Sequence, residues 1–320
     1  MKNDFNQIDV GYSIMLYSFS SCGMMIVNKL AIHNFHLPIT LTILQFIFAV
    51  IVVIIPLFLK KEKILLFKDT LRWCFVSFLF AMMLSSSMYS FQYVSLGTIL
   101  MFNNTRTIFS LILEKFINRI DFNYSIMLSL IGIFFGIVIY ASHDITFSLI
   151  GYFFCFINMI SSILERVSQK HLISIYQIPL SNVGMVFYNN LFGIFWLFPF
   201  IFIMKENVKY VQEFDQLSLK GLFFVIGSMI CGLLISYAGF RLQRRVSATT
   251  LLVINNANKI GVLLFSFFII HEKYTMGMKI GLLISFLFCI LYGYLRNKFN
   301  EQNNNNNKYD VLNKIILNQK

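Results

Sequence analysis

The chain has 320 residues, of which 58% are hydrophobic and only 12% are charged. Apolar runs recur along almost the whole length, so an ordinary soluble domain is excluded and a polytopic membrane protein is indicated. The net charge of +12 does not point to nucleic acid as a partner, because the basic residues are spread along the chain instead of forming one patch.

Stretches of about 20 apolar residues, bounded by charge or proline, predict ten transmembrane helices and an all-α fold class. In chain order they cover residues 10–32, 38–59, 72–93, 96–116, 123–141, 147–167, 181–204, 218–240, 247–270 and 276–295. Almost nothing separates the third span from the fourth, so nine spans also fit the pattern.

The distribution of lysine and arginine predicts how these spans are oriented. With a cytosolic N-terminus, eighteen of these residues fall on the cytosolic side and five on the other, which the positive-inside rule favours. Residues 1–9 form a polar cytosolic tail without the basic segment of a secretory signal, so the first span is expected to be an uncleaved anchor. Residues 297–320 contain an asparagine run and predict a disordered cytosolic tail.

Histidine and cysteine give no sign of a metal or a catalytic centre. The five cysteines fall one per span, as expected of small apolar packing residues. His33 and His36 have no third ligand nearby, so no metal site is predicted. All five histidines lie in loops or at span edges, and no converging catalytic set is found. The sequence therefore predicts neither an enzyme nor a cofactor.

Three cations lie inside predicted spans, namely Lys29, Arg106 and Lys259. Lys259 follows the start of the ninth span by twelve residues, roughly 18 Å into a hydrocarbon core about 30 Å thick. Polar groups at this depth are costly and normally face a cavity filled with water or ligand. We therefore expect a ligand site that includes Lys259 and the adjoining amides Asn255, Asn256 and Asn258.

The fourth span carries a similar cluster. Residues 95–108 align without gaps to residues 247–260, so that Asn103 and Asn104 match the first two asparagines of the ninth-span cluster. Arg106 supplies the cation in this copy. We expect the two clusters to approach each other at mid-depth.

A second pairing matches Lys29 with Lys170 and Pro38 with Pro179. The chain is thus predicted to consist of two five-span repeats, residues 10–141 and 142–296. Because five is odd, the repeats would be inverted relative to each other, with Lys29 and Lys170 at opposite membrane faces. This arrangement is typical of alternating access.

The charges inside the spans favour an anionic ligand. All fourteen aspartates and glutamates are assigned to tails, loops or span edges, including Glu165, which is expected to pair with Arg166 at the cytosolic interface. Without a carboxylate inside a span, proton or sodium coupling is not expected, which favours exchange of one anion for another. Lysine can bind phosphate, while asparagine, tyrosine and threonine can bind a base and hydroxyls.

Two motifs carry a resemblance to a known family. Phe187-Tyr188-Asn189-Asn190 matches the FYNN motif of GDP-mannose transporters, and residues 255–259 resemble a degenerate form of their GALNK motif. The chain is therefore similar, over about residues 10–296, to the nucleotide-sugar transporters of the drug/metabolite transporter superfamily. The resemblance implies that Tyr188, Asn189 and Asn190 read the base, Asn258 a sugar hydroxyl and Lys259 the diphosphate.

The resemblance also implies the partners and the location. A cytosolic GDP-mannose-like nucleotide sugar would enter the Golgi or endoplasmic reticulum lumen in exchange for a nucleoside monophosphate. A homodimer is also compatible with the resemblance. Asn255 and Asn256 replace the Gly-Ala that permits close approach of the sugar, so a UDP-sugar such as UDP-N-acetylglucosamine competes as cargo. A sugar-phosphate or triose-phosphate translocator would instead clamp phosphate with Lys29, Lys170 and Arg106.

Overall fold

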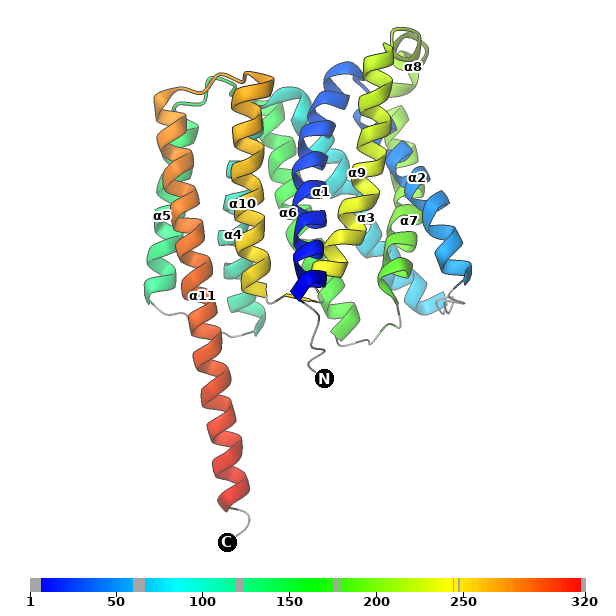
Figure 1. The fold of residues 1–320 in the computed structure, drawn as a ribbon. Coiled ribbons are helices and arrows are strands. Elements are labelled where there is room, and N and C mark those ends of the chain that lie inside the picture. Colours follow the sequence, from blue (N-terminus) through cyan, green and yellow to red (C-terminus); the bar gives the residue numbers. More distant parts are fainter. Residues whose placement is uncertain are drawn as a thin grey trace.

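The computed structural model describes residues 7–59, 67–118, 124–174, 176, 178, 180–243, 245–246 and 248–317. The regular elements of this part of the chain are all helices (Figure 1). They are α1 (Gln7–Asn34), α2 (Pro38–Leu59), α3 (Phe67–Tyr93), α4 (Leu96–Asn118), α5 (Tyr124–Ser142), α6 (Leu149–Ser174), α7 (Asn182–Ile203), α8 (Glu206–Asp215), α9 (Leu219–Gln243), α10 (Ala248–Phe265), the π-helix η1 (Ser266–Ile270) and α11 (Met276–Leu317).

Within the described residues, 8 helices are long and apolar enough to cross a membrane, namely α1, α2, α3, α5, α6, α7, α9 and α11. They confirm a polytopic helical membrane protein. The two further predicted spans correspond to α4 and α10, and the described part of α10 and η1, Ile254–Ile270, is a shorter apolar helix. Both lie among the spanning helices in the bundle (Figure 1).

The bundle has two ends that differ in what they carry. α1 begins at one end, and α11 projects beyond that same end, which we call the terminal face (Figure 1). The other end, the opposite face, carries α8 and the connection between η1 and α11. Because the chain enters the bundle and leaves it at the same face, it crosses the bundle an even number of times.

Between the seventh and eighth predicted spans, Glu206–Asp215 form the short helix α8. Glu206 in α8 is only 3% exposed, and its carboxylate accepts hydrogen bonds from the backbone N–H of Ile39 and of Thr40, each at 2.9 Å. The first N–H groups of α2 have no partner within their own helix, and a carboxylate satisfies them while complementing the helix dipole. α8 therefore anchors the start of α2.

Two helices extend further than the sequence predicts. α6 continues to Ser174, so Glu165 lies inside the helix with its side chain buried, and its expected place at a span edge is wrong. α11 runs to Leu317 through the segment for which the sequence predicts disorder. That segment contains neither glycine nor proline, and extending an existing helix avoids the cost of nucleating a new one.

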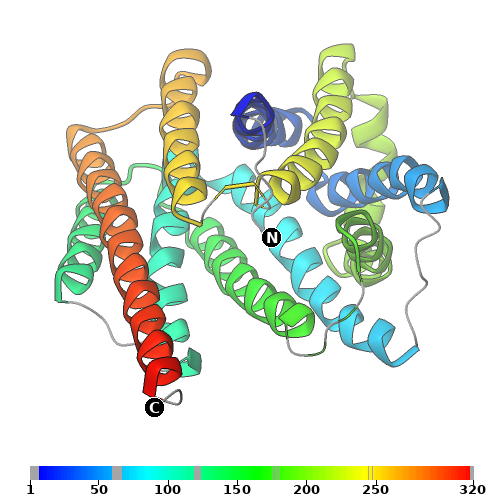
Figure 2. The same cartoon turned by 60° about the horizontal axis from the view of Figure 1, so that its bottom comes forward.

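The helices divide into two packed groups. In the six-helix group α1 packs along α9, α2 along α7, and α3 along α6 and α7. In the four-helix group α5 packs along α11, beside α4 and α10. The groups meet mainly where α1 contacts α10 and where α4 contacts α6, as Figure 2 shows from the terminal face. We call this contact the group boundary.

Glycines bring α5 and α11 into very close contact. A Cβ atom added at Gly136 would lie 2.5 Å from the backbone nitrogen of Ser285, and one at Gly281 would lie 2.6 Å from that of Tyr140. Backbone atoms cannot move aside as a flexible side chain can. Close approach at small residues is how membrane helices gain packing energy in the absence of a hydrophobic driving force. We call this contact the glycine seam.

Candidate substrate site

The centre of the site is Lys259 on α10. Its ammonium donates hydrogen bonds to Asn104 Oδ1 on α4 at 2.8 Å and to Asn256 Oδ1 on its own helix at 3.3 Å. Asn104 is 0% exposed, and its amide nitrogen donates to Ser285 Oγ on α11 at 2.8 Å. The asparagine and cation clusters of the fourth and ninth predicted spans thus meet, as the sequence alignment predicts.

The other side of α10 faces α1 across the group boundary. The Tyr17 hydroxyl donates to Asn255 Oδ1 at 2.7 Å, and Cys22 Sγ lies 3.4 Å from the backbone oxygen of Asn258. The side-chain nitrogen of Asn258 is buried and has no hydrogen-bond partner among the described residues. A buried donor without an acceptor costs about 1–3 kcal/mol, which a ligand oxygen would recover.

Two arginines add positive charge beside Lys259. Arg106 on α4 and Arg166 on α6 lie within electrostatic range of each other, and both act on the Lys259 ammonium. Across the described part of the chain, none of these three cations forms a close ion pair with a carboxylate, although Glu165 lies within electrostatic range of Arg166. Lys259 and Arg106 are partly buried while Arg166 is exposed, and an anion bound among them would relieve the repulsion between the three cations.

The FYNN residues lie elsewhere, on α7 where it packs against α3. Asn189 is buried, and its Oδ1 accepts hydrogen bonds from Trp73 Nε1 at 2.8 Å and from Ser77 Oγ at 3.3 Å. The Asn190 amide donates to Val186 O of its own helix at 2.6 Å. Tyr188 packs against the hydrophobic cluster that contains Trp73. No described hydrogen bond brings these three residues to Lys259.

The remaining predicted site residues are also dispersed. Lys29 lies towards the opposite face, 3.7 Å from Glu272 Oε1, so it already has a carboxylate partner. Asn103 is partly buried on α4, next to Asn104. Lys170 lies on α6, and its side chain is outside the described part of the structure.

The sequence prediction missed three residues that the structure connects to the site or to Lys29. Tyr17 has no distinctive spacing within its apolar helix. The sequence predicts that Arg166 lies at the cytosolic interface near the end of the sixth span, whereas α6 continues past it to Ser174. Glu272 had a usable signal, since a cation inside a span, such as Lys29, normally requires a counter-charge.

Comparison with known proteins places the chain among transporters. Residues 8–293 match the Triose-phosphate Transporter family. The chain is 27% identical to the GDP-mannose transporter GONST3 of Arabidopsis thaliana over 288 residues, covering 86% of this chain and 76% of that protein. It is 26% identical to the GDP-fucose transporter 1 of the same plant over 275 residues, or 79% and 76% of the two chains.

A mouse relative covers a shorter part of the chain. The nucleotide sugar transporter SLC35D2 of Mus musculus is 29% identical over 157 residues, which are 48% of this chain and 47% of that protein. The family match extends from the first turn of α1 into α11, so it includes both helix groups and every residue around Lys259. The chain belongs to the triose-phosphate transporter family.

Proposed function

We propose that the protein carries a cytosolic nucleotide sugar across the Golgi or endoplasmic reticulum membrane in exchange for a nucleoside monophosphate. The observation that supports this most directly is the cluster of Lys259, Arg106 and Arg166, in which neither Lys259 nor Arg106 has a carboxylate partner among the described residues. A diphosphate ester carries the charge that such a cluster favours, and a monophosphate leaving in return would use the same contacts.

The asparagines around these cations suit the uncharged part of such a cargo. Asn104 and Asn256 hold the Lys259 ammonium with their carbonyl oxygens, and phosphate oxygens would replace those acceptors when the cargo binds. The unpartnered Asn258 amide supplies a donor to a sugar hydroxyl. Relatives named GDP-mannose and GDP-fucose transporters support a GDP-sugar, while UDP-sugars stay in competition.

The helix packing supports two inverted repeats and alternating access. If α1 to α5 correspond to α6, α7, α9, α10 and α11, the contact of α1 with α9 corresponds to that of α6 with α3. Likewise the contact of α1 with α10 corresponds to that of α6 with α4. Such exchange of equivalent contacts is expected of repeats related by a two-fold axis in the membrane plane. In this proposal ten helices span the membrane and both termini are cytosolic.

Exchange by purified protein in liposomes tests the proposal. Vesicles preloaded with GMP, with UMP or with no nucleotide would be given radiolabelled GDP-mannose, GDP-fucose or UDP-N-acetylglucosamine. We expect uptake of one nucleotide sugar only when the matching monophosphate is inside. Equal uptake into empty vesicles would overturn the exchange mechanism, and no uptake of any nucleotide sugar would overturn the cargo class.

The second candidate is a sugar-phosphate translocator, which the family match and the three clustered cations favour. Such a protein would exchange triose phosphate or a phosphorylated sugar for inorganic phosphate. The same vesicles loaded with inorganic phosphate distinguish the two functions. If triose phosphate competes with the labelled cargo for uptake while free nucleotides do not, the cargo lacks a base.

A further inference from the structure

Lys29 is held at the opposite face by the end of α3. Its ammonium donates to the backbone oxygens of Phe91 at 2.8 Å and of Val94 at 2.6 Å. The carboxylate of Glu272 lies 3.7 Å away, and the two side chains are 16% and 12% exposed. Carbonyl groups at a helix C-terminus carry partial negative charge, so the helix end and the carboxylate both stabilise the cation.

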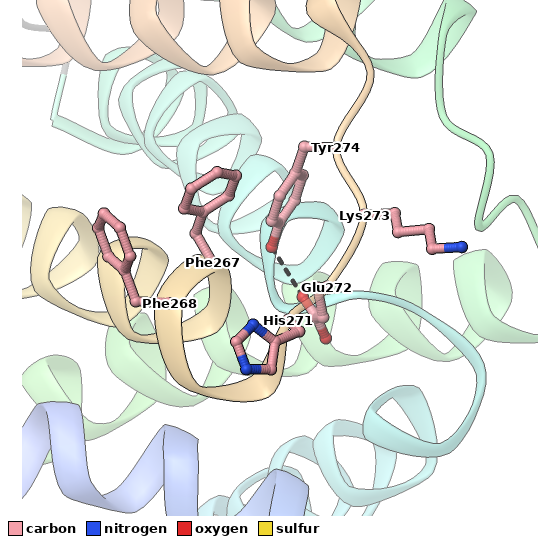
Figure 3. A pocket seen from close by; sticks show the side chains of 6 residues that line it. All are labelled: Phe267, Phe268, His271, Glu272, Lys273 and Tyr274. Carbon is pink, nitrogen blue, oxygen red and sulfur yellow. Dashed lines mark hydrogen bonds between the residues drawn. The ribbon is translucent and has the colours of Figure 1, made fainter.

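Glu272 is held by the neighbouring helix start and by its own loop. Its carboxylate accepts hydrogen bonds from the backbone N–H of Leu96 in α4 at 3.0 Å and from Ser266 Oγ at 2.5 Å. It also accepts one from the Tyr274 hydroxyl at 2.7 Å, which Figure 3 shows. Burial, followed by the charge of Glu272, raises the pKa of Tyr274, so that hydroxyl keeps its proton and donates. The acid and the cation are therefore fixed on adjoining helix ends.

This ion pair connects the two helix groups. Lys29 belongs to the six-helix group, whereas Glu272 lies between η1 and α11 of the four-helix group. The other ion pairs of the described residues stay within one group or join it to α8; they are Asp9 with Arg241 and Arg245, Asp69 with Arg72, and His36 with Glu213. Separating the groups at the opposite face would break the Lys29–Glu272 pair in particular.

The segment leading to Glu272 has an unusual backbone. α10 ends in the π-helix η1, and π-helical turns are rare and frequently occur at functional sites. His271, which follows directly, has a φ of 58°, in the left-handed region that residues other than glycine seldom adopt. One continuous helical segment thus joins Lys259 to a strained turn and then to Glu272.

We propose that Lys29 and Glu272 form a gate that closes the opposite face and must open for cargo to leave there, an inference that rests on the proposed transport function. In the structure the gate is closed. In this proposal Lys29 controls the opening of the gate, and it does not have to contact the cargo. An anion that draws Lys259 away from Asn104 and Asn256 would act on α10, the helix that leads through η1 to Glu272.

Cys155 on α6 is a native reporter for the state of this gate. It is 2% exposed, lies in the same buried cluster as Phe91, Val94 and Leu96, and is within electrostatic range of Lys29. The labelling test uses full-length protein in which the other four cysteines are replaced by alanine, whereas exchange is measured on protein that keeps all five, because Cys22 contacts Asn258 in the site. The rate at which a charged methanethiosulfonate reagent modifies Cys155 then measures how often the gate opens.

The variants are Glu272→Gln, Lys29→Met and the double variant, with Glu213→Gln as the matched control. Glu213 pairs with His36 at the same face but does not join the two helix groups. We expect each single variant to raise the Cys155 labelling rate about tenfold, the order expected when one charge-assisted contact is lost from an opening equilibrium. The double variant should match the single variants, and the control should match the parent protein.

The outcomes separate the gate from the cargo assignment. If Glu272→Gln is monodisperse and labels Cys155 at the parent rate, the gate is refuted. Additive effects in the double variant would also refute it, because the two residues would then act independently. If labelling responds as expected but the liposomes exchange no nucleotide sugar, the gate stands and the proposed cargo fails. If Lys29→Met abolishes exchange without changing labelling, Lys29 contacts cargo and does not form the gate.

Discussion

Replacing Lys259 by alanine should remove most of the affinity for a phosphorylated cargo while leaving the protein folded. A charge-assisted hydrogen bond to phosphate contributes ~1.5–3 kcal/mol, so cargo affinity should fall roughly 10- to 100-fold. The substitution also leaves the buried Asn104 Oδ1 without its donor, which by itself costs about 1–3 kcal/mol. Relief of repulsion among Lys259, Arg106 and Arg166 offsets part of that cost.

The assay combines cargo binding and thermal unfolding on purified protein. Lys279→Ala is the matched control, because Lys279 is also a cation of the four-helix group but lies over the Phe267 ring, outside the Lys259 cluster. Lys259→Arg should fail as well, since a planar guanidinium does not replace a compact ammonium between two amide oxygens. If folded Lys259→Ala binds the cargo as tightly as the parent does, the central contact is wrong and phosphate must bind at Arg106 or Arg166.

Three further results are expected. Asn189→Ala should lower the thermal unfolding midpoint by an amount equivalent to about 1–3 kcal/mol, because Trp73 Nε1 loses its acceptor. The same variant should show an altered base preference in exchange assays with competing nucleotides. Gly136→Val should prevent monodisperse folding in size-exclusion chromatography, whereas Gly11→Ala, with nothing near the added Cβ, should not. Because exchange of one anion for another needs no proton, exchange should not follow an imposed pH gradient; a response that Glu165→Gln abolishes would show that the buried Glu165 carries a proton.

The sequence predicts the helices well because apolar length and flanking charge are local properties of the chain. It also predicts that Asn104 and Lys259 meet, since matching clusters in two repeats imply a shared place in the fold. It could not predict that Glu206 anchors α2, because nothing in the sequence around Glu206 marks which helix start lies beside it. Lys29 does indicate that a counter-charge is needed, but its sequence does not identify Glu272 as the acid that supplies it. A polar loop looks the same in sequence whether its acids face water or a helix end.

The FYNN motif shows a different limit. The motif is correctly placed on a spanning helix, but a motif does not reveal which neighbour its amides contact in a given conformation. Asn189 accepts hydrogen bonds from Trp73 and Ser77, which lie on another helix more than a hundred positions away in sequence. Only the packing of α3 against α7 determines that contact, and packing depends on the whole bundle.

The glycine seam determines where the protein can be blocked. Backbone atoms already touch at Gly136 and Gly281, and separating α5 from α11 would give up contacts that nothing in lipid replaces. In the proposed exchange cycle, the two helix groups would therefore move against each other at the group boundary, where α1 meets α10. A small molecule wedged there, between Tyr17 and Asn255, would arrest the protein without imitating any phosphate. Such an inhibitor could be uncharged and so reach its target through the membrane.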